Sequence, residues 1–178
     1  MKKILFLHDT NTSLKRGAEL TITQLVALGN QLGYIVSVDL LTNFDSTKSK
    51  IQESDLIVLN STSRCRFEKK LLHYLIDEKI KYIKIEFDYN FCIRRNILCT
   101  VDRGIRNCCD NEKYHLYHHV FANAKLNAFQ SPKHYQDHFE FYGESVANKI
   151  IMPPTVEVDK LQISENKNET VIPFFGDL

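Results

Sequence analysis

The sequence predicts an α/β fold of the doubly wound type, with a mainly parallel sheet and helices on both faces. Two observations lead to this prediction. Short apolar runs rich in β-branched residues alternate with longer segments of helical periodicity along most of the chain. Glycines, prolines and small polar residues stand between these segments, where helices and strands begin and end. Strands that alternate with helices form parallel sheets through right-handed crossovers.

Length and composition indicate one globular domain. The chain has 178 residues, of which 43% are hydrophobic and 25% charged. A net charge of +1 argues against nucleic acid as a partner, because no strong positive field would neutralise a phosphate backbone. The apolar run Ile4–Leu7 is shorter than the roughly 7–15 residues of a signal-peptide core. We therefore expect a cytoplasmic protein with its five cysteines reduced.

The first 41 residues read as a strand, a helix and a second strand. Ile4–Leu7 is the first strand, and a polar loop leads to a helix that begins near Gly17. The apolar positions of that helix recur at steps of three and four: Ala18, Ile22, Leu25, Gly29 and Leu32. Gly33 is expected to end the helix, and Tyr34–Leu41 to form the second strand. Free backbone N–H groups at such a helix start favour phosphate binding.

The remaining elements follow from the same signals. Thr42–Ser54 is polar and reads as a loop with at most one helical turn, and Asn60–Ser63 are expected to cap the helix that follows them. The long segment 88–110 reads as a loop that is either functional or mobile. Ser131 and Pro132 are expected to begin a helix that Gly143 ends. The other predicted strands are 55–59, 82–87, 125–130 and 149–152, and residues 111–123 form a further helix.

Three motifs, in this order, resemble the N-terminal half of a GT-B glycosyltransferase, especially the family-four retaining enzymes. They are Arg16-Gly17-Ala18-Glu19, the segment from Ala124 to Ser131, and the segment from Lys149 to Glu157. The resemblance implies a Rossmann-like, acceptor-side domain over residues 1–160. It implies that residues 161–178 are a linker and the first strand of a missing C-terminal, donor-binding domain.

The resemblance also implies an activity: transfer of a sugar from a nucleotide-sugar donor to a glycan, lipid or other hydroxyl acceptor. The donor would be held mostly by the missing domain, so this chain alone would be incomplete and inactive. No cofactor is implied. The chain departs from the family where Arg16 replaces a glycine and where Phe87 replaces a histidine.

Five residues are predicted to form the site. Gly17 and Arg16 would face the donor phosphates, because a glycine lets phosphate approach the backbone and an arginine adds charge. Asp88, just past a strand end, would orient or deprotonate the acceptor hydroxyl as the catalytic residue. His8 and Asp9 would line the acceptor cleft. Each assignment has a structural alternative. Gly17 would then only make a tight turn from strand to helix, and His8, Asp9 and Asp88 would only form hydrogen bonds within the loops.

Other binding functions are less well supported by the sequence. No metal is predicted, because Cys108, Cys109 and the histidines at 115, 118 and 119 lack the spacing of a structural zinc site. One predicted helix has a basic face, which we expect to be exposed to solvent; weak peripheral membrane contact is the alternative. The face is formed by Arg64, Arg66, Lys69, Lys70 and Lys79. The other function classes are a non-catalytic Rossmann-like binding module and an unrelated doubly wound domain.

Overall fold

Six strands form one parallel sheet in the order β2-β1-β3-β4-β5-β6. The computed structural model describes residues 1–14, 17–89 and 111–153. The strands are β1 (Lys3–Leu7), β2 (Ile35–Asp39), β3 (Leu56–Leu59), β4 (Tyr82–Glu86), β5 (Leu126–Phe129) and β6 (Lys149–Ile151). The helices are α1 (Gly17–Gln31), α2 (Phe44–Gln52), α3 (Glu68–Asp77), α5 (Asn111–Asn123) and α6 (Pro132–Tyr142), with short 3-10 turns η1 (Thr12–Leu14) and η3 (Gly143–Val146). The predicted doubly wound, Rossmann-like α/β fold is confirmed.

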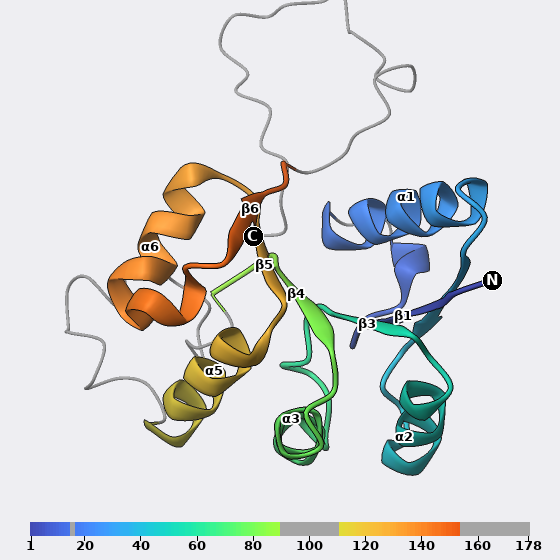
Figure 1. The fold of residues 1–178 in the computed structure, drawn as a ribbon, viewed down its shortest axis with the longest axis horizontal. Helices are drawn as coiled ribbons and strands as arrows, with labels where there is room; N and C mark the ends of the chain where they lie inside the picture. Colours follow the sequence, from blue (N-terminus) through green and yellow to red (C-terminus); the bar gives the residue numbers. More distant parts are fainter. Residues whose placement is uncertain (15–16, 90–110, 154–178) are drawn as a thin grey trace, which may run out of the picture.

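The strand order distributes the helices unequally between the two faces of the sheet. The chain steps from β1 to β2 in one direction and from β2 through β3 to β6 in the other. Because crossovers are right-handed, the helix of the first step lies on the opposite face from the helices of the later steps. Figure 1 shows α1 on one side of the sheet and α2, α3 and α5 on the other.

The core is divided in the same way. Alternate residues of β1 point to opposite faces, as the period of a strand requires. Phe6 belongs to a smaller apolar cluster that includes Ile22 of α1. Leu5 and Leu7 belong to a larger cluster to which α2, α3, α5 and α6 contribute. The face covered by α1 therefore has the smaller core.

Several predicted boundaries are confirmed. Gly33 follows α1 with φ of 83°, a left-handed conformation that glycine adopts without strain. Ser131 caps α6 by accepting a hydrogen bond from the His134 amide at 3.1 Å, and Pro132 is the first helical residue. The expected change of domain at residue 160 lies outside the described residues.

The prediction of a loop over Thr42–Ser54 is wrong, because α2 occupies Phe44–Gln52. Asn43 caps this helix by accepting a hydrogen bond from the Ser46 amide at 3.0 Å. Only Thr47 and Ile51 of the helix are buried, so it lacks the apolar stripe by which helices are recognised in sequence. Tertiary hydrogen bonds of Thr47 and Lys50 to Asp39 hold it instead.

Two further details differ from expectation. Asn60–Ser63 do not cap the next helix, which begins later, at Glu68, and has no side-chain cap. The polar groups of this segment are used elsewhere: Ser61 bonds to Asp9 and Thr62 to Glu68. Leu32, assigned to the buried side of α1, is 66% exposed because the helix ends one residue earlier.

Candidate functional site

The carboxyl ends of β1 and β3 mark the point where the strand order reverses. The chain leaves β1 toward β2 on one side, and β3 lies on the other side of β1. Open α/β sheets bind ligands at such a switch point, because the connections diverge there and leave a crevice. The residues that follow these two strands, His8 and Asn60, are therefore the first to consider.

His8, Glu19 and Asn60 form a buried polar group at this point, here called the switch-point cluster. His8 is 1% exposed, and its Nε2 lies 3.3 Å from Oε1 of Glu19 in the first turn of α1. Asn60 is fully buried, and its amide donates to the carbonyl of Leu7 at 3.0 Å, which places it beside His8. Neither Glu19 nor Asn60 was expected from the sequence to belong to the site.

The switch-point cluster has spare hydrogen-bonding capacity. His8 Nδ1, Glu19 Oε2 and both polar atoms of the Asn60 carboxamide are buried without a hydrogen-bond partner among the described residues. A buried polar group without a partner costs roughly 1–3 kcal/mol, so such groups usually meet water or a ligand. The cluster offers a carboxylate, an imidazole and an amide, which is the chemistry that binds hydroxyl groups.

Gly17 begins α1 beside this cluster. A Cβ built on Gly17 would have no atom of the described residues within 4 Å, and its φ is not in the left-handed region. Neither a close approach nor a special turn conformation therefore requires glycine there. The first N–H groups of a 15-residue helix have no partner within the helix and carry partial positive charge, which favours an anion. Arg16, the other predicted phosphate-binding residue, lies outside the described residues.

Asp9 contributes to the structure of the loops around the site. Its Oδ2 accepts hydrogen bonds from the Arg64 amide at 2.7 Å and from Ser61 Oγ at 3.3 Å. Its Oδ1 accepts from Thr10 Oγ1 at 3.0 Å. This carboxylate therefore ties the loop after β3 to the end of β1.

Asp88 follows β4, two strands away from His8 at the same edge of the sheet. Its amide donates to Glu86 Oε1 at 3.4 Å, and its carbonyl oxygen lies 3.4 Å from Nε2 of His134. Tyr89 then donates to Asp137 Oδ2 at 3.0 Å. Burial, with Asp137 beside it, raises the pKa of Tyr89 to about 12. Asp88 is thus held at the edge by backbone contacts, with its side chain half-buried.

A second polar group, missed by the sequence analysis, lies on the opposite face under α5 and α6. Lys84 Nζ is 2.8 Å from Glu86 Oε2, and it donates to the carbonyls of Ile85 at 2.9 Å and Asn60 at 3.2 Å. Burial alone would raise the pKa of Glu86, but Lys84 and His138 hold it below its ordinary value. The signal in the sequence was the two-residue spacing, which puts Lys84 and Glu86 on one face of a strand.

His138 shares this environment. Burial lowers the pKa of His138 to about 4, even though the Glu86 carboxylate opposes the shift. The imidazole is therefore neutral near pH 7, and its Nδ1 lies 2.8 Å from the carbonyl oxygen of His134. The interaction of His138 with Glu86 therefore connects α6 to β4, on the face of the sheet opposite to α1.

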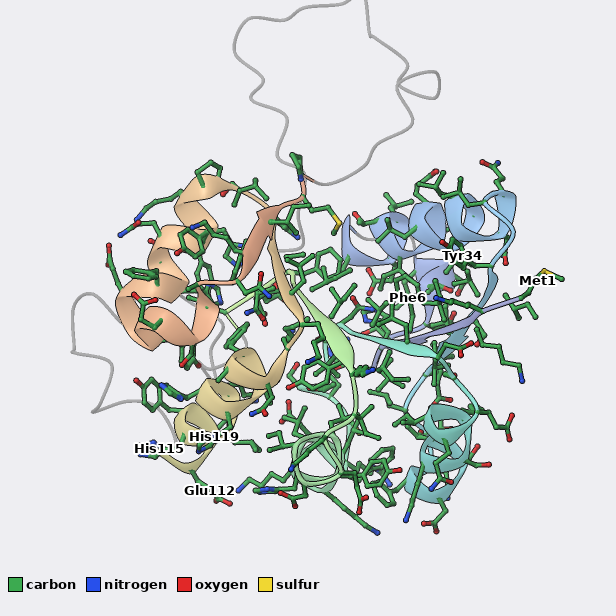
Figure 2. All side chains as sticks on the ribbon, viewed as in Figure 1. Met1, Phe6, Tyr34, Glu112, His115 and His119 are labelled. Carbon is green, nitrogen blue, oxygen red and sulfur yellow. The ribbon has the colours of Figure 1, made fainter. Side chains whose placement is uncertain are left out.

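Two of the binding functions considered from the sequence, metal binding and membrane contact, involve residues that the structure describes only in part. Residues 1–14, 17–89 and 111–153 contain no group of three or more His, Cys, Asp or Glu side chains placed to hold a metal ion. Figure 2 shows His115 and His119 on the outer side of α5. Within the basic face, Lys69 pairs with Glu112 at 2.5 Å and Lys70 lies over the Phe44 ring at 3.9 Å. No helix in these ranges is long and apolar enough to span a bilayer.

Comparison with known proteins gives no match: no family model, no curated protein and no solved structure is significantly similar to this chain. The function of this chain is therefore inferred from the switch-point cluster, the start of α1 and the sequence motifs.

Proposed function

We propose that this chain is the acceptor-side domain of a glycosyltransferase that uses a nucleotide-sugar donor. The observation that carries the proposal is the switch-point cluster beside the first turn of α1, whose buried polar atoms lack hydrogen-bond partners among the described residues. A helix start with free N–H groups suits the donor diphosphate, whose negative charge increases as the sugar leaves. The cluster beside it suits the hydroxyl groups of a sugar or acceptor. The ordered motifs of the sequence add to this support.

In this mechanism each part has a separate role. The amides at the start of α1 would stabilise the leaving diphosphate, with Arg16 adding a charge-assisted hydrogen bond. His8 and Glu19 would orient a hydroxyl group by hydrogen bonds, and Asp9 would keep the adjacent loop in place. Asp88 would act on the acceptor hydroxyl as orienting group or base. The donor nucleotide would be held mainly by a second domain.

The phosphate role can be tested on the 178-residue chain by amide chemical shifts. We expect inorganic diphosphate at millimolar concentration to shift the amides of Gly17, Ala18 and Glu19. Gly17→Val should abolish these shifts, because its side chain would fill the space beside the helix start. Leu28→Val, a β-branched substitution at an exposed position of the same helix, should leave them unchanged. Diphosphate that shifts none of these amides would contradict the phosphate role.

The transferase role needs a second measurement. In the longest natural protein that contains these residues, Gly17→Val should abolish sugar transfer while the protein stays folded, and Asp88→Asn should slow transfer. Unchanged turnover in both variants would reject the glycosyltransferase proposal.

A non-catalytic binding module is the second candidate. It is favoured by the loop hydrogen bonds that occupy Asp9 and by Phe87 in place of a histidine. This candidate predicts diphosphate or sugar binding at the same amides without transfer by any natural form of the protein.

A further inference from the structure

The sheet face that carries α1 is only half covered by helices. Of the helices described, α1 alone lies on this face, and it packs beside β2, since a Cβ on Gly29 would lie 2.6 Å from Val36 of that strand. Figure 1 shows α1 near the β1 and β2 end of the sheet, with β6 at the other end. The open half is an apolar groove of about 270 Å³, with Leu25 of α1 in its wall. Its floor includes Val58, Ile83, Ile85, Leu126, Ala128 and Ile150.

The outer surface of α1 carries no charge. After the first turn, the exposed residues of this helix are Leu20, Thr23, Ala27, Leu28, Asn30 and Gln31. Residues 20–38 as a whole contain no acidic, basic or histidine side chain. The helices on the opposite face differ, because Lys50 of α2, Lys70 of α3 and Glu140 of α6 are exposed. Charged residues are depleted where a surface becomes buried between protein chains, since a charged group loses its hydration there.

We propose that this face binds a second copy of the chain, with α1 of each copy lying in the groove of the other. A two-fold axis that runs along the strands, at the middle of the sheet, exchanges the covered half of one copy with the open half of the other. From β3 to β6 the floor is about 14 Å wide, and a helix with its side chains is about 10 Å in diameter. One helix therefore fits the open half. This inference does not depend on the glycosyltransferase proposal.

The two surfaces match in charge and polarity. The floor of the groove contains only apolar side chains, and the charged residues of β4, Lys84 and Glu86, point to the opposite face. Two polar side chains of α1 already have partners within the chain. Thr23 Oγ1 donates to the Glu19 carbonyl at 2.8 Å, and Asn30 Oδ1 accepts from the Val36 amide at 3.2 Å. The contact therefore buries no charged side chain of the described residues, and neither surface repels its copy.

The area is sufficient for a dimer. Helix α1 has 15 residues and is therefore about 22 Å long. Each contact of a helix with a groove is about 22 Å by 10 Å, so the two contacts cover about 900 Å² of the two chains. Leu28 and Leu32, which are 51% and 66% exposed, lie on the same side of α1 as Leu25 and add apolar surface where the two helices meet. The total reaches the roughly 1,000 Å² expected of a specific interface.

Sedimentation equilibrium of the whole 178-residue chain, from micromolar to millimolar concentration, tests the proposal. We expect a reversible dimer. Leu20→Glu on α1 and Ile150→Lys on the floor should each weaken dimerisation by about 100-fold or more. Both side chains are partly exposed, at 40% and 47%, so the variant monomers should keep the urea midpoint of the wild-type monomer. A chain that stays monomeric at every concentration would overturn the proposal.

Matched controls lie on the opposite face. Ile35→Lys changes an isoleucine of the other edge strand that is 45% exposed, and its side chain points away from the α1 face because the adjacent Val36 points toward it. Ser49→Glu adds a carboxylate to an exposed position of α2. Neither control should weaken the dimer. Equal losses in Ile150→Lys and Ile35→Lys would place the contact elsewhere and overturn the proposal.

A mixing experiment tests the reciprocal arrangement. In a pair formed by one Leu20→Glu chain and one Ile150→Lys chain, the glutamate enters the groove that contains the lysine, and the second contact keeps its wild-type residues. The mixture should therefore dimerise at least about tenfold more tightly than either variant alone. Absence of this gain would reject the arrangement. A monomer that instead uses Leu20 and Ile150 to bind phosphatidylcholine vesicles would assign the face to a membrane surface and also overturn the proposal.

Discussion

Lys84 and Glu86 form a fully buried ion pair on a single strand: Nζ lies 2.8 Å from Oε2, and the two side chains are 1% and 0% exposed. Lys84 also donates to the carbonyl of Asn60, so the pair joins β4 to the residue that follows β3. The two opposite charges neutralise each other on one face of the sheet. Through the carbonyl of Asn60, Lys84 also helps to hold the switch-point cluster, which lies on the other face.

Removing one member of this pair should strongly destabilise the fold. Lys84→Met leaves the Glu86 carboxylate buried without its cation, which typically costs about 3–5 kcal/mol. Glu86→Gln should also destabilise, and the double variant Lys84→Met/Glu86→Gln should lose less than the sum of the two. Urea denaturation measures all three. Lys69→Met, which removes one partner of the exposed Lys69–Glu112 pair, is the control and should change little. Additive losses would show that the two side chains act independently.

His138 should make stability depend on pH below neutrality. Its pKa is about 4 in the folded protein, below the ordinary value of 6.5, so the unfolded chain binds the extra proton between these values. The free energy of unfolding should therefore fall as pH falls from about 6.5 toward 4, by at most about 3 kcal/mol at 1.36 kcal/mol per pKa unit. Urea titrations above pH 5 avoid the protonation of most carboxylates.

Matched histidine variants isolate this effect. His138→Asn removes the titrating group and keeps a side-chain donor, so its stability should vary less with pH than that of the wild type. His119→Asn changes an exposed histidine of α5 and should retain the wild-type slope. If both variants keep the same slope, another group causes the pH dependence.

The two glycines of α1 should respond oppositely to alanine. A Cβ on Gly29 would lie 2.6 Å from Cγ2 of Val36, a stiff β-branched side chain, so Gly29→Ala should destabilise by about 1–3 kcal/mol. Gly17→Ala meets no such neighbour and should keep or slightly raise stability, since alanine is the better helix former. Thermal denaturation compares them. Val36→Ala should partly rescue Gly29→Ala, and an absence of rescue would contradict the steric explanation.

The fold could be predicted because most of its elements carry local signals. Ser131 and Pro132 identify the start of α6, and the continuous apolar run of β3 identifies a strand covered on both faces. Such signals depend on near neighbours in the sequence. They were sufficient for the strand and helix order, and hence for the parallel sheet.

The site could be predicted only in part, because its contacts join residues far apart in the chain. His8 was recognised from its place after a strand, but its partner Glu19 reads as an ordinary residue of a helix surface. Asn60 reads as a helix cap, and only the sheet register places it beside His8. The α2 helix was missed for a similar reason, since its main support comes from Asp39 at the end of another element.

Helix α2 should depend on the hydrogen bond from Thr47 to Asp39. The Asp39 side chain is 5% exposed, and its carboxylate accepts from Thr47 Oγ1 and Lys50 Nζ. Thr47→Val keeps the shape of the side chain but removes the donor, so we expect a loss of about 1–3 kcal/mol. Ser49→Val introduces the same side chain on the exposed side of the helix and controls for helix propensity. Urea denaturation that finds equal losses for the two variants would show that propensity, rather than the bond to Asp39, determines the stability of α2. Because the Asp39 carbonyl accepts from the His8 amide at 3.0 Å, a selective loss in Thr47→Val would also connect α2 to the end of β1.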